Sequence, residues 1–369
     1  MNAEPLRSTM TKPNLLILAC SLVAGLPPAP AGELAPPAGP IGPTMRNLNA
    51  VEPRTPLPVP GSGSVAAGRG SVILISSPGS YYLTADVSVP ADMNGIEITA
   101  SNVTLDLNGF SVDGAAGSLK GIAVTAPAPP SPRNLAIRNG TVRGMGEDGV
   151  DAGIANNVQV RDLRVENWNT TAGGPFAAIR SASVGTISDC TIVGSSATTS
   201  GDGIVVGSGF LVTRCSVAVT QGAGIRASDG STIITNSIWG NRINAVVCTV
   251  GCTIAKNTCD LTLSGAPDEA SILVGSRCHV FANNCSSFVF AVPGIRATGN
   301  QNRIDGNHVR SDAAGIVITG IANIIVRNTV NATAVPPYSI GAGNAFGGVV
   351  AVGGGGAFAG VDPWANFTY

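Results

Sequence analysis

Hydrophobic and polar residues repeat along this chain in a unit of twenty-odd residues. Each unit starts with a small residue followed by Ile or Val, passes through a turn into a second β-rich run, and reaches an Asn or Asp. The starts are Gly95-Ile96, Gly121-Ile122, Gly149-Val150, Ala178-Ile179, Gly203-Ile204, Gly224-Ile225, Ala245-Val246, Ser271-Ile272, Gly294-Ile295 and Gly315-Ile316. Self-similarity at this period indicates a solenoid, in which each repeat packs against its neighbours.

The composition of the repeat selects among the known solenoids. Leu is too scarce for a leucine-rich repeat, and Gly with β-branched residues is too frequent for a helical repeat. A unit of this length with two or three short strands fits one coil of a parallel β-helix. We therefore predict an all-β parallel β-helix of about ten to eleven coils.

A second column of polar residues supports the coil. Short polar side chains at one turn can adopt left-handed backbone angles and stack their hydrogen bonds from coil to coil. Arg214 interrupts this column, whose predicted members are Asn108, Asn139, Asp162, Asp189, Asn236, Asn257, Asn283, Asn307 and Asn328.

The same register gathers charged residues on one outer face. The residue after the inward Ile or Val of each start points outward, so Asp151 and Arg180 are expected about 5 Å apart in neighbouring coils. Asp148 and Asp202 each precede a start and are expected two coils apart, on the order of 10 Å. With Arg226 they form the candidate catalytic set: Asp148, Asp151, Asp202, Arg180 and Arg226.

Two chemistries fit these residue types. Two carboxylates with room for water between them suit an inverting glycoside hydrolase. A lyase needs a cation beside a uronate carboxylate and a base, so Asp148, Asp151 and Asp202 could hold Ca²⁺ through oxygen ligands while Arg180 or Arg226 removes the proton. Calcium is the one cofactor predicted. The alternative is a structural ion-pair network on a solvated face, which mimics an active site.

Six cysteines recur at matching positions of neighbouring coils, and coil spacing lies inside the usual Cα separation of a disulfide. The candidate disulfide residues are Cys190 with Cys215, Cys252 with Cys278, and Cys259 with Cys285; Cys248 is left as the odd thiol. The alternative is a buried ladder of reduced thiols. The clustered Cys-x-x-Cys spacing of a zinc site is missing.

The ends of the chain suggest an exported protein. Arg7 and Lys12 precede the apolar run 15–24, and Ala29-Pro30-Ala31 follows, as in a secretory signal peptide. A lipoprotein signal ending at Cys20 is the alternative. We expect a signal peptide at 1–31, a Pro/Gly/Ala-rich arm at 32–71, the β-helix at 72–330 and a Gly-rich cap at 331–369. The expected location is extracytoplasmic (periplasmic, cell-surface or secreted), with no transmembrane segment in the mature chain, and a net charge of −1 argues against nucleic-acid binding.

Several segments resemble a known superfamily. Ser77-Pro78-Gly79-Ser80-Tyr81-Tyr82-Leu83-Thr84, 102–110, 134–141 and 323–329 resemble coils of bacterial right-handed parallel β-helix proteins of the pectin-lyase-like superfamily, and the resemblance spans roughly 34–369. It implies a right-handed coil. The superfamily includes polysaccharide lyases, hydrolases, epimerases and phage tailspikes.

One polygalacturonase motif is matched in part. Gly146-Glu147-Asp148-Gly149-Val150-Asp151 resembles Asn-Thr-Asp-Gly-Ile-Asp, which carries over only to Asp148 and Asp151. Ala177 and Ala178 stand where two Asp residues should follow, and His279 and His308 are followed by Val in place of Gly, which argues against a working hydrolase of that type. The expected function is binding or cleavage of an acidic polysaccharide; the alternative is a non-catalytic structural or surface-interaction scaffold.

Overall fold

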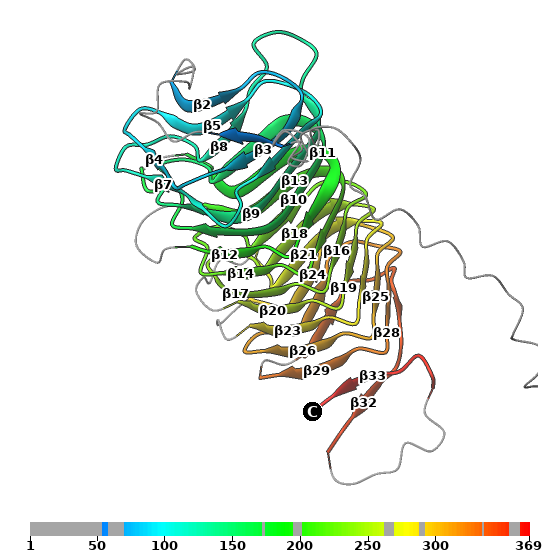
Figure 1. The fold of residues 1–369 in the computed structure, drawn as a ribbon. Helices are drawn as coiled ribbons and strands as arrows, with labels where there is room; N and C mark the ends of the chain where they lie inside the picture. Colours follow the sequence, from blue (N-terminus) through cyan, green and yellow to red (C-terminus); the bar gives the residue numbers. More distant parts are fainter. Residues whose placement is uncertain are drawn as a thin grey trace, which may run out of the picture. The chain divides into compact units, whose positions relative to one another are not determined.

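The chain divides into two units, residues 1–52 and 53–369. The computed structural model describes residues 54–57, 70–171, 174–194, 201–261, 269–287, 292–333, 336–353 and 362–369, all in the second unit. The predicted signal peptide and most of the predicted arm lie outside these residues. Within them every regular element is a strand, and none is a helix long and apolar enough to cross a membrane (Figure 1).

Each coil adds one strand to each of three parallel strand columns, which we call the first, second and third columns (Figure 1). The first column contains β2 (Ser71–Ile75), β5 (Asn94–Ile98), β8 (Ile122–Val124), β15 (Ile225–Ala227), β18 (Val246–Val250), β21 (Ile272–Ser276), β24 (Ile295–Ala297), β27 (Ile316–Ile318) and β30 (Tyr338–Ile340). The second contains β1 (Thr55–Leu57), β3 (Gly79–Leu83), β6 (Val103–Asp106), β16 (Thr232–Ile234), β19 (Thr253–Ala255), β22 (His279–Phe281), β25 (Arg303–Asp305), β28 (Ile324–Val326) and β31 (Ala345–Phe346).

The third column contains β4 (Val87–Val89), β7 (Ser111–Gly114), β12 (Thr191–Val193), β14 (Ser216–Ala218), β17 (Ser237–Asn241), β20 (Thr258–Leu261), β23 (Asn284–Ser287), β26 (His308–Ser311), β29 (Thr329–Ala332) and β33 (Asn366–Thr368), and β32 (Val349–Ala351) pairs with β33. Four long strands bend from one column into the next: β9 (Arg133–Arg143), β10 (Val150–Glu166), β11 (Ala177–Ser188) and β13 (Asp202–Thr213). The prediction of an all-β parallel β-helix is confirmed, with about eleven coils.

The first column shows why each repeat starts with a small residue and an aliphatic one. Ile122 pairs with Val150, and Val150 with Ile179, so that fully buried side chains stack along the axis. Burying each such side chain stabilises the fold by about 2 kcal/mol. A Cβ placed on Gly149 would lie 2.5 Å from Val165 Cγ1 and 2.6 Å from the Ala178 carbonyl oxygen. The start residue must therefore be small, because the next coil and the opposite wall both approach its backbone.

The predicted turn column is two adjacent columns. Residues with positive φ form one of them, the αL column: Asn108, Asn139, Asp162, Asp189, Arg214, Thr235, Lys256, Ala282, Gly306 and Arg327. Stacked amides form the next position, the Asn ladder: Asn236, Asn257, Asn283, Asn307, Asn328 and Asn366. The prediction assigned the left-handed backbone and the stacked amide to the same residue, whereas they lie on adjacent residues. The predicted residues from Asn236 onward belong to the Asn ladder, and those before it belong to the αL column. A stacking amide must point into the coil, where Cys215 and Cys190 stand in the earlier coils, whereas the αL residue faces outward.

The thiol pairs lie side by side, as the register predicts. Cys259 and Cys285 are Cα partners on β20 and β23, and Cys190 and Cys215 directly precede Thr191 and Ser216, which are Cα partners on β12 and β14. All seven described cysteines are buried and are present as free thiols. The disulfide pairing stays a prediction.

Thiol titration checks the pairing. For protein made in an oxidising compartment and unfolded without reductant, we expect the Cys248 thiol alone to react among these seven. Reaction of all seven would leave a ladder of reduced thiols. In that ladder a hydrogen bond to Cys259 and burial raise the pKa of Cys285, so it should stay unreactive until the protein unfolds.

Candidate functional site

The predicted charged face exists, and it alternates in sign along the axis. Asp151 is the Cα partner of Arg180, Arg180 that of Val205, and Val205 that of Arg226, as the sequence register predicts. Ala177, which is hydrogen-bonded to Asp148, is also the Cα partner of Asp202, so these two carboxylates lie two coils apart. We call this set the axial charge row: Lys120, Asp148, Asp151, Arg180, Asp202 and Arg226.

Asp148 is the buried member of the row. Its side chain is 3% exposed, and its Oδ1 accepts hydrogen bonds from the backbone N–H of Ala177 (2.6 Å) and from Nε of Arg180 (3.3 Å). Burial raises the pKa of Asp148, although the Ala177 N–H and the Arg180 charge act in the opposite direction. Asn94 does the same for the next coil in its own part of the chain, because its Oδ1 accepts a hydrogen bond from the backbone N–H of Lys120 at 3.1 Å. Asp148 therefore fixes the turn of the next coil and orients Arg180.

Lys120 completes the row and was missed from the sequence. Its Nζ lies 2.5 Å from Oδ2 of Asp151, whose Oδ1 accepts from the Gly153 N–H at 2.9 Å. Burial alone would lower the pKa of Lys120, but the hydrogen bond and charge of Asp151 raise it overall. One signal was available: Lys120 precedes Gly121 as Asp148 precedes Gly149, so both occupy the same position of the repeat.

Asp202 and Arg226 repeat the arrangement of Asp148 and Arg180. Asp202 Oδ1 accepts from the Ala223 N–H at 2.6 Å, and its Oδ2 lies 2.8 Å from Nε of Arg226. The difference is exposure, because the side chains of Asp202 and Arg226 are 19% and 44% exposed. This pair is the most accessible ion pair of the row, and its groups can reach a ligand without rearrangement of the backbone.

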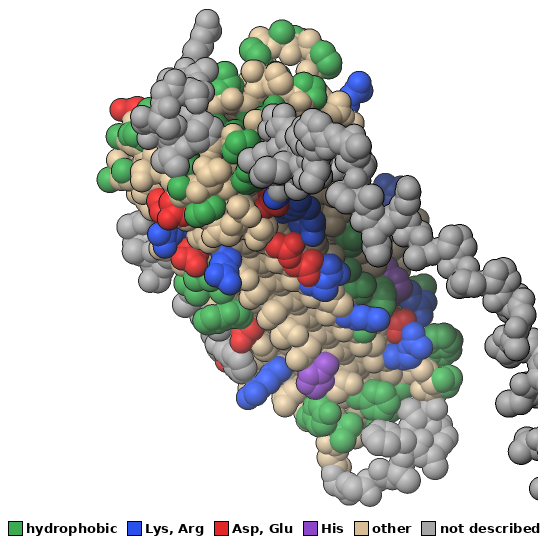
Figure 2. Space-filling model, viewed as in Figure 1, with side chains coloured by type: hydrophobic (Ala, Val, Ile, Leu, Met, Phe, Trp, Pro, Cys, Tyr) green, Lys and Arg blue, Asp and Glu red, His purple; other side chains and the backbone are tan. Residues whose placement is uncertain are grey.

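The row is balanced in charge, with three basic and three acidic side chains. On the face drawn in Figure 2, acidic and basic side chains likewise lie next to one another. Across the described ranges, no group of three or more His, Cys, Asp or Glu side chains is placed to hold a metal ion. Calcium binding by Asp148, Asp151 and Asp202 therefore stays a prediction from the sequence.

The polar side chains of residues 303–312 form a second charged segment, and they lie on two different columns. Arg303 and Asp305 lie on β25 of the second column, whereas His308 and Arg310 lie on β26 of the third. Asp305 forms an ion pair with Arg327 of the following coil, with 2.7 Å between Nε of Arg327 and Oδ1 of Asp305. The repeat pattern does not connect these two positions, because Arg327 lies in the αL column and its side chain reaches back by one coil.

No protein-family model and no curated protein matches the sequence. Among solved structures, the A-module of the Azotobacter vinelandii mannuronan C-5 epimerase AlgE6 is 15% identical, with a TM-score of 0.53 over 79% of this chain and 88% of that one. A mutant tailspike protein of E. coli bacteriophage HK620, in complex with a pentasaccharide, is 10% identical, with a TM-score of 0.52 over 87% of this chain and 72% of that one. DFA-IIIase from Arthrobacter chlorophenolicus A6 without its lid is 14% identical, with a TM-score of 0.47 over 79% of this chain and 88% of that one.

The likenesses to the epimerase A-module and to the tailspike establish the fold. The structural neighbours are right-handed parallel β-helix proteins of the pectin-lyase-like superfamily, which confirms the resemblance seen in the coil sequences. At such low identity the residues of the axial charge row cannot be transferred from any of them. The chain has the right-handed parallel β-helix fold.

Proposed function

We propose that this protein binds an acidic polysaccharide along the axial charge row, with the sugar chain running parallel to the axis of the coils. Arg180 and Arg226 contact its carboxylates, and Asp151 and Asp202 accept hydrogen bonds from its hydroxyl groups. Guanidinium groups suit this task because their planar donors match a carboxylate in pairs.

The observation that carries the proposal is the spacing of accessible cations. Lys120, Arg180 and Arg226 come from every second coil, and Arg180 and Arg226 occupy the same position of the repeat, with backbones about 10 Å apart. Each of the three cations forms an ion pair with a carboxylate from an adjacent coil, and each keeps part of its side chain exposed. Preorganised charges at a fixed repeat fit an extended polymer with repeating charges better than a small ligand. The fold supports this proposal, because a mannuronan epimerase and a tailspike in complex with a pentasaccharide share it.

Cleavage is the stronger form of the proposal. A uronate lyase would use Arg180 or Arg226 as the base and would need a cation near the carboxylate, for which calcium bound by Asp148, Asp151 and Asp202 remains the proposed source. Export, proposed from residues 1–31, would place the protein where such polymers occur.

A substrate panel tests the function. Polygalacturonate, alginate and a neutral glucan are incubated with the protein, with and without Ca²⁺, and bound polymer, reducing ends and unsaturated products are measured. We expect binding of the two polyuronates and none of the glucan. Failure to bind either polyuronate would leave the second candidate, a non-catalytic scaffold. That candidate is favoured by the structural use of Asp148, whose carboxylate serves the next coil as Asn94 does.

A further inference from the structure

A cavity of about 420 Å³ lies on the second column, away from the axial charge row. It is lined by His279, Phe281, Ala282, Asp305, Gly306 and Arg327. These residues come from β22, β25 and the αL column, and none belongs to the row. The volume falls within the range of small-ligand pockets.

Two small residues in the αL column open this cavity. Ala282 and Gly306 occupy successive coils there, between Lys256 in the preceding coil and Arg327 in the following one. A Cβ added to Gly306 would meet nothing within 4 Å, so the space above its backbone is open. Lys256, Ala282 and Arg327 adopt the same positive φ, so a side chain at residue 306 can be accommodated at the cost of the strain that non-Gly residues bear in this conformation.

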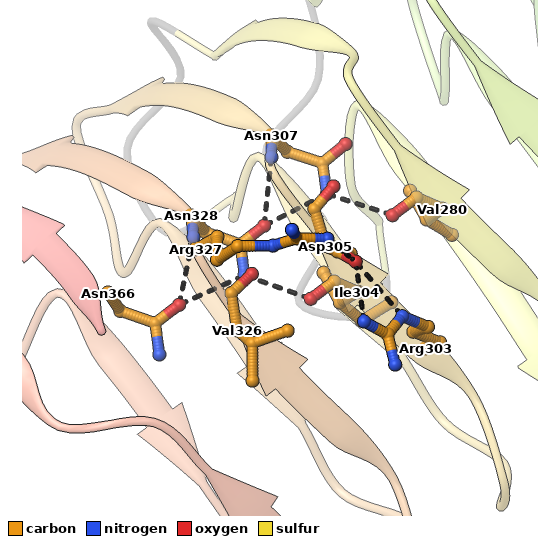
Figure 3. A network of polar contacts seen from close by, with 9 residues as sticks. All are labelled: Val280, Arg303, Ile304, Asp305, Asn307, Val326, Arg327, Asn328 and Asn366. Carbon is orange, nitrogen blue, oxygen red and sulfur yellow. Dashed lines mark hydrogen bonds and ion pairs between the residues drawn. The ribbon is translucent and has the colours of Figure 1, made fainter. Parts of the chain in front are cut away.

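One wall of the cavity is charged (Figure 3). Arg303 and Arg327 converge on Asp305 from the same and the following coil, with Nη2 of Arg303 2.8 Å from Oδ2 and Nε of Arg327 2.7 Å from Oδ1. Burial acts to raise the pKa of Asp305, but hydrogen bonds from Arg327 and Arg303 bring it below its usual value. Asp305 therefore stays ionised, and the three groups together keep one positive charge. The Trp364 ring lies 5.3 Å from the Arg327 guanidinium and steadies it.

The neighbouring coil supplies an aromatic wall, because His279 and Phe281 on β22 are the Cα partners of Arg303 and Asp305. The two rings have centroids 4.4 Å apart and planes tilted by 31°. Burial, with the charge of Arg303, lowers the pKa of His279, so the imidazole is neutral at pH 7. In the part of the chain that the structure describes, Nε2 of His279 is buried and has no hydrogen-bond partner. Buried polar atoms without a partner are rare and call for an explanation.

We propose that this cavity binds a carboxylate-bearing sugar, such as a uronic acid, with Arg327 on the carboxylate and the His279–Phe281 wall against the apolar face of the ring. Guanidinium recognises the planar anion, and an aromatic face packs on the C–H groups. Asp305 accepts from a sugar hydroxyl, and a half-turn of the imidazole brings Nε2 to the ligand. The site is separate from the axial charge row and does not depend on the function proposed for it.

Histidine NMR tests the site directly, because the chain has only two His residues. His308 lies on β26 in the third column and serves as the internal reference. On titration with trigalacturonate we expect the ring signals of His279 to shift saturably while those of His308 stay in place. The pKa of His279 should rise in the complex, since a nearby carboxylate favours the imidazolium. The neutral trigalactose should cause no shift.

Two variants and their matched controls define the residues. Gly306→Gln places a side chain in the open space of the cavity, and Arg327→Gln removes the carboxylate contact; each should weaken binding by about tenfold or more. Gly230→Gln, at another positive-φ glycine with open space above it, and Arg214→Gln, at another αL arginine paired with an Asp, should bind as the parent does.

Unmoved His279 signals, equal shifts with the neutral sugar, or full binding by Gly306→Gln would each overturn the proposal. The outcome is independent of the axial charge row, because Arg226→Gln should leave the His279 titration unchanged whether or not the row binds polymer.

Discussion

Replacing Asn307 by Ala should lower the free energy of unfolding by about 4 kcal/mol. The Nδ2 of Asn307 donates to the Val280 carbonyl (2.9 Å) and to Oδ1 of Asn328 (2.9 Å), while its Oδ1 accepts from both the backbone N–H and the Nδ2 of Asn283 (3.0 Å each). The position is 1% exposed, so water cannot replace these partners. Each buried group left without a partner costs about 1–3 kcal/mol. Urea-induced unfolding of the two proteins measures the difference.

The matched control for Asn307→Ala is Asn331→Ala, on an exposed position of β29. This change should alter stability by about 0.5 kcal/mol or less. Equal effects at the two positions would show that the Asn ladder contributes no more than an ordinary surface residue. Figure 3 shows how Asn307, Asn328 and Asn366 follow one another through the last coils, so the loss at Asn307 should also loosen the C-terminal coils.

The second large effect is expected at Asp148, and it depends on the replacement. Asp148→Ala leaves the Ala177 N–H and the Arg180 guanidinium without their acceptor, at a cost of about 2–4 kcal/mol. Asp148→Asn keeps an oxygen for the Ala177 N–H, as Asn94 does for Lys120, and should cost about 1 kcal/mol or less near neutral pH. Thermal or urea unfolding of both variants at pH 7 checks the difference. Similar losses for Ala and Asn would mean that the charge, rather than the cap, holds this turn.

The pH dependence of these proteins gives a further check on Asp148. Its pKa is raised in the folded chain by burial, so the folded state binds this proton more tightly than the unfolded chain does. The favourable contribution of the protonated form is therefore present at low pH and is lost as pH rises through the folded pKa. Above the usual carboxyl pKa, the stability of Asp148→Asn relative to the parent should improve with pH. A relative stability that falls over that window would contradict the burial of this carboxylate.

Much of the fold could be read from the sequence because the repeat is local and its reasons are steric. Gly149 must be small for the coils to approach, and Val150 must be apolar to fill the interior, so the start recurs and fixes the register. That register correctly paired Asp151 with Arg180. In the early coils the predicted column was off by one residue from the stacking position. Asp189 is polar like the ladder amides, and only its positive φ shows that it belongs to the αL column.

The candidate sites were harder to predict, for a physical reason. A side chain's partner in a solenoid lies one coil away, and long side chains reach across that distance in a direction that the pattern does not set. Lys120 reaches forward to Asp151, and Arg327 reaches back to Asp305. The burial of Asp148 also could not be seen in a segment that reads as a polar turn. Asp148 and Asp151, which lie three residues apart in sequence, therefore differ in burial and in partners in the fold.

The central claim is that acidic polysaccharide binds along the axial charge row, and calorimetric titration with oligogalacturonate tests it most directly. The comparison is between the parent, Arg226→Gln and Arg214→Gln, the last being an exposed Arg–Asp pair outside the row. We predict that Arg226→Gln weakens binding by about tenfold, with a loss of salt dependence, and that Arg214→Gln has no effect. Binding that is unchanged by Arg226→Gln, or weakened equally by both replacements, would contradict the claim.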